Sequence, residues 1–141
     1  MEIWLGIEPV TQLRPRFSTR PYPHEYDPPK VKAYKTMLHS VLLDKMKELG
    51  FKEPLDGSLE VNLRFYRSIQ KSGSKELKAR KNNGLVLPNV KPDSDNYVKA
   101  FFDACNGAVW KDDALITDFS VKKRYSDHPH IELEVLSLNK Q

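Results

Sequence analysis

One helix, fixed at both ends by its own sequence, constrains the fold of this chain most strongly. Pro92 disfavours helix at the residue before it, and Asp93 or Ser94 can then cap a helix N-terminus. Asn106-Gly107 provides the C-terminal stop, because glycine readily adopts the left-handed conformation that ends many helices. Apolar residues recur between these ends at helical spacing, at Val98, Phe101, Phe102 and Cys105. The sequence therefore predicts a helix whose apolar face lies in the core.

Aspartates gather in and just after this helix, although the chain carries a formal net charge of +4. They are Asp93, Asp95, Asp103, Asp112 and Asp113. Asp95, Lys99 and Asp103 are spaced i, i+4 and i+8, so they form a row on a different face from the apolar residues. One interpretation is that the row and the cap only stabilise the helix, by about a few tenths of a kcal/mol per ion pair.

The positions of Asp112 and Asp113 favour a metal site over that interpretation. Both follow a tight turn and a short apolar link, which return the chain toward the helix just before the alternating segment ALITDFSV. Like charges brought together near other carboxylates destabilise a fold unless something neutralises them. A divalent cation such as Mg²⁺ does so, since hard cations prefer carboxylate oxygens and water as ligands.

Other metal sites fit the sequence less well. The four histidines show no zinc-ligand spacing with the single cysteine, and the residues after Asp93 lack the glycine and glutamate of an EF-hand loop. A Mg²⁺ site on a basic protein suits phosphodiester chemistry, because the ion activates water and stabilises the leaving oxygen. Lys99, which lies among the carboxylates, is placed to hold a phosphate oxygen.

The segment KPDSDNYVKAFFDACNGAVWKDDALI resembles the signature of RusA-type Holliday junction resolvases, small endonucleases of bacteria and their prophages. The shared pattern is a Pro-Asp-x-Asp-Asn opening, a lysine four residues after the second aspartate, then Asp-Ala, Asn-Gly and a closing Asp-Asp. These residues are Pro92, Asp93, Asp95, Asn96, Lys99, Asp103, Ala104, Asn106, Gly107, Asp112 and Asp113. The motif covers about a fifth of the chain, and its several fixed spacings make it specific.

The resemblance implies a homodimer that binds four-way DNA junctions and nicks two opposing strands with Mg²⁺, in DNA recombination and repair. By position, the catalytic residues correspond to Asp93, Asp95, Lys99 and Asp113. The three aspartates among them correspond to metal ligands, and we expect Asp112 to join them. The role of Asp103 stays open. The basic segment from Lys71 to Lys81 is longer than a minimal member of the family requires, which leaves the substrate preference open.

Outside the motif, the sequence predicts the remaining elements of an α+β fold. Strands are expected at residues 2–8, 58–69, 114–126 and 130–138, the last two as an antiparallel pair. A long helix is expected from Pro28-Pro29 to Gly50. Together with the first helix described, these elements predict a single domain over residues 1–141, with one mixed, mostly antiparallel β-sheet packed with two main helices.

Two segments are less regular. Residues 11–30 are too rich in proline for a helix or a central strand, so we expect a loop there. Residues 70–88 are rich in Lys, Ser, Asn and Gly, and KELKARKNNG within them fits either a short helix ending at Gly84 or a mobile basic excursion.

Basic residues outside the helix are candidates for contacts with DNA phosphates, because neutralising phosphates releases condensed counterions. They are Arg14, Arg16, Arg20, Lys71, Lys75 and Lys91. The alternative to a DNA contact is that these residues belong to an ordinary solvated surface. Trp110 and Phe119 are expected in the core rather than stacked on DNA bases. Cys105 lies on the apolar stripe and is expected to be a core residue rather than a nucleophile.

The composition excludes several classes of protein. Hydrophobic residues make up 39% and charged residues 30%, as in ordinary globular proteins. No apolar run is long enough for a transmembrane helix, and the N-terminus does not have the pattern of a signal peptide. One cysteine cannot form an internal disulfide, which fits the reducing cytoplasm, so we expect a cytoplasmic protein. Because the apolar runs are short, we expect no membrane partner.

Two classes of function remain open from the sequence. The first is a Mg²⁺-dependent endonuclease that resolves four-way junctions, or a nuclease of broader specificity for branched or flap DNA. The second is a basic nucleic-acid-binding module that does not cleave, in which the carboxylates are structural. Two symmetric nicks are most simply made by a C2 dimer. Its interface is expected on the long helix, the N-terminal strand or the final strand pair.

Overall fold

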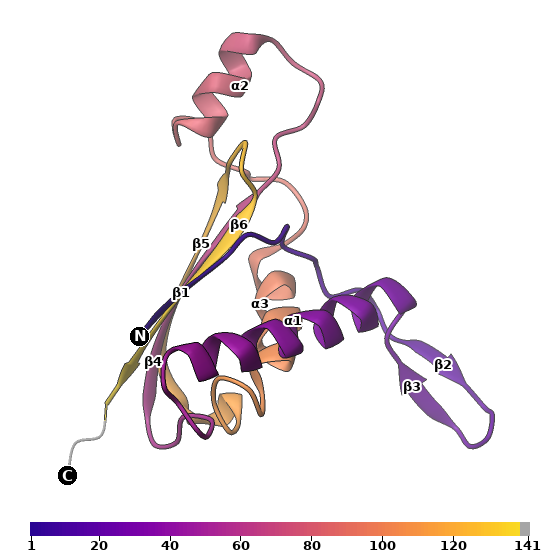
Figure 1. Cartoon of the computed structure of the whole chain (residues 1–141). Coiled ribbons are helices and arrows are strands. Elements are labelled where there is room, and N and C mark those ends of the chain that lie inside the picture. Colours follow the sequence, from indigo (N-terminus) through magenta and orange to yellow (C-terminus); the bar gives the residue numbers. More distant parts are fainter. Residues whose placement is uncertain (139–141) are drawn as a thin grey trace. The chain divides into compact units, whose positions relative to one another are not determined.

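The computed structural model describes residues 1–138, which form three α-helices, a four-stranded sheet and a two-stranded sheet (Figure 1). This confirms the predicted α+β class. The described residues form two compact units. Unit 1 consists of Met1–Pro9, Gly57–Ser94 and the chain from Ala114 on, and unit 2 of Val10–Asp56 and Asp95–Asp113. The last three residues of the predicted domain, 139–141, lie outside the described residues.

Unit 1 contains the four-stranded sheet, in the order β1-β6-β4-β5. Its strands are β1 (Glu2–Leu5), β4 (Leu59–Arg67), β5 (Ile116–Tyr125) and β6 (His130–Ser137). The central strand β6 runs antiparallel to both β1 and β4, whereas β4 and β5 run parallel. The sheet is therefore mixed and mostly antiparallel, as predicted.

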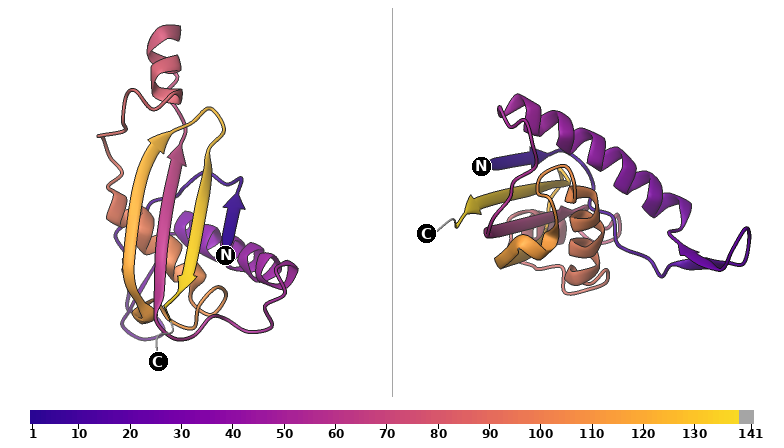
Figure 2. Two further views of the ribbon diagram at one scale, coloured as in Figure 1. Left: turned by 90° about the vertical axis from the view of Figure 1, so that its left-hand side faces the viewer. Right: turned by 90° about the horizontal axis from the view of Figure 1, so that it is seen from below.

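The predicted pairing of the last two strands is wrong. Strands β5 and β6 follow each other in the sequence, but β4 lies between them and pairs with both (Figure 2). The apolar residues of β4 alternate, and all of them are buried: Leu59, Val61, Leu63 and Phe65. The alternation of apolar and polar residues shows which face of a strand is buried, but it does not show which strand lies beside it in the sheet. The pairing was predicted because the two segments are adjacent in the sequence.

The basic segment after β4 contains a helix, α2 (Lys75–Asn82), which confirms the first of the two alternatives for residues 70–88. The Ser74 hydroxyl accepts a hydrogen bond of 3.1 Å from the Leu77 N–H and caps the N-terminus. Gly84 has a φ of 77° just after the C-cap Asn83, a conformation that suits glycine. Helix α2 lies beyond one end of the sheet and has no buried residue (Figure 2).

Unit 2 is built around two helices, α1 (Pro29–Glu48) and α3 (Ser94–Cys105), the latter from Asp95 on. Both confirm predicted helices. The buried residues of α1 are Val31, Tyr34, Leu38, Leu42 and Met46. The two helices are joined by a contact of 2.9 Å between His39 Nδ1 and the Ala104 carbonyl oxygen. Trp110 is fully buried and donates a 2.8 Å hydrogen bond from Nε1 to Asn106 Oδ1, which confirms its place in the core.

The proline-rich segment 11–30 is not only a loop. It contains a short two-stranded antiparallel sheet, formed by β2 (Arg16–Ser18) and β3 (His24–Tyr26), which precedes α1 (Figure 1). The prolines lie in the turn and the flanks, outside the six strand residues, so the strands keep their N–H groups for pairing. No helix in the part of the chain that the structure describes is long and apolar enough to cross a membrane.

Candidate active site

Helix α3 displays the candidate residues on its exposed face. Asp95, Lys99 and Asp103 are all exposed, and the opposite face buries six residues, namely Tyr97, Val98, Ala100, Phe101, Ala104 and Cys105. Asp95 lies in the first turn, where its Oδ1 accepts a 3.0 Å hydrogen bond from the Asn96 N–H. A carboxylate in this turn is also favoured by the helix dipole. The helix thus presents two carboxylates and one ammonium group along a single exposed row.

The segment after α3 brings a second pair of carboxylates toward the helix. Asp112 is exposed, and Asp113 is half-buried at the start of the short 3₁₀-helix η1 (Asp113–Leu115). Burial raises the pKa of Asp113, and a hydrogen bond with Asp112 raises it further. The negative charges of Asp112 and Asp103 act in the same direction, whereas a hydrogen bond with Asn106 lowers the pKa of Asp113. Asp103, Asp112 and Asp113 therefore lie close enough to interact, and their negative charges repel.

Asp103 is paired with a residue of α1 rather than with Lys99. Lys35 Nζ lies 2.7 Å from Asp103 Oδ2 and 2.7 Å from Asp27 Oδ2, and its side chain is only 17% exposed. Burial opposes the charge of Lys35, but the two carboxylates outweigh it and raise the pKa of Lys35. The ion pair therefore fixes the C-terminal part of α3 to α1, and Asp103 does more than stabilise its own helix.

Asp27 joins this ion pair to the start of α3. The hydrogen bond from Lys35 lowers the pKa of Asp27, whereas burial raises it. A second hydrogen bond, donated by Gln12 Nε2 at 3.0 Å, and the charge of Lys99 lower the pKa of Asp27 further. Gln12 is buried, and its backbone N–H donates a 3.0 Å hydrogen bond to the Asn96 carbonyl oxygen. Gln12, Asp27 and Lys35 were not predicted as candidate residues, because no local pattern in the sequence marks an ion pair between residues 68 positions apart.

Replacing Lys35 by methionine is expected to lower the free energy of unfolding by about 1–3 kcal/mol at pH 7, since the part-buried Asp27 and the exposed Asp103 both lose their partner. The pKa of Asp27 is lowered in the folded protein, so its contribution is present above its ordinary value of 3.8 and is lost as the pH falls through the folded value. Urea denaturation at several pH values measures the difference. Lys45→Met, which removes an exposed pair with Glu48 at 3.9 Å, is the control and should cost less than about 1 kcal/mol.

Two further candidate residues, Asp93 and Lys91, lie in unit 1, in the loop that precedes α3. Asp93 and Lys91 have exposed side chains. Two strand residues hold the backbone of this loop: Arg67 Nη1 donates a 3.1 Å hydrogen bond to the Lys91 carbonyl oxygen, and Lys123 Nζ donates to the carbonyl oxygens of Val90 and Pro92 at 2.7 and 2.8 Å. The loop that presents Asp93 is therefore anchored to both β4 and β5.

Carboxylates are the ligands that a Mg²⁺ site with few protein ligands would use. Within residues 1–138, no group of three or more His, Cys, Asp and Glu side chains is arranged to hold a metal ion. Mg²⁺ usually keeps several waters and takes one or two carboxylates from the protein, so exposed carboxylates with mutual repulsion fit this ion. In unit 2, Asp95 and Asp112 are exposed, and the half-buried Asp113 interacts with Asp112 and Asp103.

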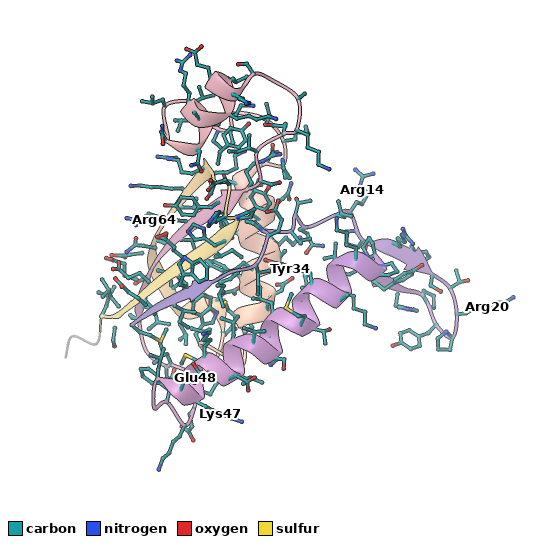
Figure 3. The ribbon with its side chains drawn as sticks, turned by 45° about the horizontal axis from the view of Figure 1, so that its top comes forward. Arg14, Arg20, Tyr34, Lys47, Glu48 and Arg64 are labelled. Atoms are coloured by element: carbon teal, nitrogen blue, oxygen red, sulfur yellow. The ribbon has the colours of Figure 1, made fainter. Side chains whose placement is uncertain are left out.

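The predicted DNA-binding residues form two separate groups in the chain. Arg14, Arg16 and Arg20 are exposed residues of unit 2, and Figure 3 shows the side chains of Arg14 and Arg20 pointing away from the ribbon. Lys71 and Lys75 are exposed residues of unit 1, beside and in α2.

Phe119 and Cys105 were both predicted to lie in the core, and only Cys105 does. Phe119 is 54% exposed on β5, so its prediction as a core residue is wrong. Its partner in the register is Val61 of β4, which is buried, and β5 forms the edge of the sheet, where a strand is less well covered. Cys105 is buried, and burial raises the pKa of its thiol well above the ordinary value. Cys105 is therefore a core residue, as predicted.

Comparison with known proteins agrees with the resemblance found in the sequence. The model of the family described as endodeoxyribonuclease RusA matches residues 6–136, which include every candidate residue from Arg14 to Asp113. A relative from Bacillus subtilis (strain 168), described as "Uncharacterized protein YqaN", is 37% identical over 131 residues, which cover 91% of this chain and 89% of the relative. The chain therefore belongs to the RusA family of endodeoxyribonucleases.

Proposed function

We propose that this protein is a Mg²⁺-dependent, structure-selective endonuclease that resolves four-way DNA junctions by paired symmetric nicks, in the cytoplasm, during recombination and repair. The observation that carries the proposal is the family match over residues 6–136, within which all the candidate carboxylates and Lys99 occur in the expected pattern. Because the match includes both compact units, we also propose that they act as one endonuclease domain.

The proposed metal ligands are Asp93, Asp95, Asp112 and Asp113. Their carboxylate oxygens suit a hard cation, and the interaction of Asp113 with Asp112 and Asp103, which adds to burial in raising the pKa of Asp113, supports the proposal, because a cation would neutralise this charge. A bound Mg²⁺ supplies an activated water and stabilises the oxygen that leaves the phosphorus. Lys99 contributes a positive charge on the same exposed row of α3 as Asp95, where it can hold a non-bridging phosphate oxygen and stabilise the charge that develops on it.

The proposed partners are four-way junction DNA and a second copy of the chain. Two nicks placed symmetrically across a junction require two active sites related by a two-fold axis, which a C2 homodimer provides. Basic side chains supply the affinity for DNA through phosphate contacts, and we assign this role to Arg14, Arg16, Arg20, Lys71, Lys75 and Lys91.

A cleavage assay with a labelled synthetic four-way junction tests the proposal. We expect paired nicks across the junction in Mg²⁺, no cleavage in EDTA, and no cleavage of linear duplex of the same sequence. Flap DNA cut as fast as the junction would instead show a nuclease of broader specificity for branched DNA. A junction that is retarded on the gel but intact in Mg²⁺ would contradict the enzyme and leave a DNA-binding module.

A further inference from the structure

The hairpin formed by β2 and β3 carries an unusual row of rings. Arg16 lies opposite Tyr26, and Ser18 lies opposite His24, so these four residues share one face. The ring centroids of Tyr22 and His24 are 5.0 Å apart, and those of His24 and Tyr26 are 5.9 Å apart. We call Tyr22, His24 and Tyr26 the aromatic row.

Core packing does not account for these rings. Tyr22 is 64% exposed and Tyr26 is 42% exposed, and Phe17 on the opposite face of the hairpin is 64% exposed. Large aromatic side chains are mostly buried in folded proteins, and an exposed group of them usually marks an interaction site.

Local hydrogen bonds preorganise the hairpin. The Ser18 hydroxyl accepts a 3.2 Å hydrogen bond from the Arg20 N–H and donates one of 3.1 Å to the Arg20 carbonyl oxygen. His24 Nδ1 lies 2.7 Å from the Tyr22 carbonyl oxygen, which holds the imidazole between the two tyrosines. A two-stranded hairpin is marginally stable by itself, so these contacts reduce the entropy lost when a ligand binds to the row.

The charge around the row favours a polyanion. Arg14, Arg16 and Arg20 are exposed in this segment, and its two acidic residues differ in their surroundings. Asp27 is already engaged by Lys35 and Gln12, and Glu25 is directed to the face of Phe17 by the strand register. Guanidinium groups bind phosphate oxygens in two-point contacts, so this segment combines rings that stack on bases with cations that hold phosphates.

We propose that the aromatic row is a stacking site for unpaired or splayed DNA bases, and that the neighbouring arginines hold the phosphates beside them. The inference rests on the proposed function, because it places the branch point of the DNA at this hairpin. In an intact duplex the faces of the bases are covered by their neighbours, whereas at a branch point stacking is interrupted and a face is available to an aromatic ring. The row therefore gives preference for branched over linear DNA, while the arginines give affinity for both.

Binding without cleavage tests the proposal. The probe is a four-way junction with 2-aminopurine at the branch-point positions, titrated with the full-length protein in EDTA, beside a linear duplex with the same labelled base. In the double variant Tyr22→Leu/Tyr26→Leu, we expect junction affinity to fall about tenfold or more and the change in 2-aminopurine fluorescence to disappear. Duplex affinity should change by less than about twofold, because phosphate contacts are retained.

Three further variants make the result specific. Tyr22→Phe/Tyr26→Phe keeps the rings and should bind the junction as the wild type does, which also shows that the hairpin tolerates substitution. Trp4→Leu removes an exposed ring of β1 in unit 1 and should leave binding unchanged. Arg16→Gln should weaken junction and duplex binding alike and reduce the dependence of affinity on salt by about one unit of slope.

Several results would overturn the proposal. One is an equal loss of junction and duplex affinity in the leucine double variant, which would make the row a general DNA contact. Another is an unchanged fluorescence response. A third is a difference in oligomeric state between the leucine double variant and the wild type, measured by sedimentation without DNA, which would make the hairpin an interface between two copies. If the wild type binds the junction with the fluorescence response but never cleaves it, the cleavage step of the proposed function fails, while the binding of branched DNA, on which this inference rests, stands.

Discussion

Replacing Asp113 by asparagine is expected to lower the rate of junction cleavage by about 10³-fold or more, a loss of about 4 kcal/mol of transition-state stabilisation. Asparagine keeps the shape of the side chain and removes one of the charges that would hold Mg²⁺. Junction affinity should stay within about twofold, because it comes mainly from Lys and Arg contacts with phosphates. Single-turnover cleavage rates and gel-shift titrations measure the two quantities separately. Asp93→Asn and Asp95→Asn should behave in the same way.

The stability of the same variant separates a metal ligand from a structural carboxylate. Burial and Asp112 raise the pKa of Asp113, so the folded protein binds this proton more tightly than the unfolded chain does. Its favourable contribution is therefore present below the ordinary value of 3.8 and is lost as the pH rises through the folded value. At pH 7 the ionised group opposes folding, so we expect Asp113→Asn to melt at the same temperature as the wild type or higher.

Mg²⁺ and a matched control complete this test. A ligand that binds only the folded state raises the melting temperature, so Mg²⁺ should raise that of the wild type more than that of Asp113→Asn. Asp44→Asn, an exposed aspartate of α1, should cleave and melt as the wild type does. An Asp113→Asn protein that cleaves normally but melts at a lower temperature would contradict the proposed role and indicate a structural carboxylate.

Replacing Lys99 by methionine is expected to lower kcat by about 10²–10³-fold, the scale measured when one group that stabilises developing oxyanion charge is removed. Methionine keeps much of the length of the side chain and removes the ammonium group. Because Lys99 is exposed and its charge acts on Asp27 only as a minor contribution, the fold should be unaffected. Cleavage rates at saturating junction and thermal melting measure both effects.

The comparison of kcat with junction affinity decides what Lys99 does. If Lys99→Met weakens binding as much as it slows cleavage, then Lys99 holds substrate in the ground state and does not act selectively in the transition state. Lys47→Met, which removes an exposed lysine near the C-terminal end of α1, is the control and should change neither quantity (Figure 3).

Asp103 differs from the other aspartates of the motif. It is held at 2.7 Å by Lys35, which also holds Asp27, so its charge is already balanced by a residue of α1. Asp95 and Asp112 lie outside this ion pair and are exposed. This arrangement gives Asp103 a structural role in placing α3, and it leaves the other carboxylates as the better candidates for metal binding.

Much of the fold followed from local patterns. Helix α3 begins after Pro92 and ends before Gly107, as predicted. The spacing of apolar residues identified buried residues of α1, α3 and β4, whereas Phe102 of the predicted stripe is only half-buried. These signals work because capping, glycine conformation and the burial of one face depend on residues that are close in the chain. The same local patterns placed Asp95, Lys99 and Asp103 on one helix, Asp93 just before it, and Asp112 and Asp113 in the short segment after it.

Other features depended on contacts between distant residues. The insertion of β4 between β5 and β6 and the exposure of Phe119 on an edge strand depend on which strands pair, and alternation does not encode this. The ion pair from Lys35 to Asp103 and the pairing that aligns Arg16 with Tyr26 are likewise specified only in three dimensions.

By itself, the sequence determined the class of the fold, the helix that carries the candidate site and the family to which the chain belongs. Only the tertiary structure decided the order of the strands, the partner of Asp103 and the gathering of rings on the hairpin. The physical reason is that helix ends and buried faces are set by neighbours within a few residues, whereas pairings between distant segments are selected by the packing of the whole chain.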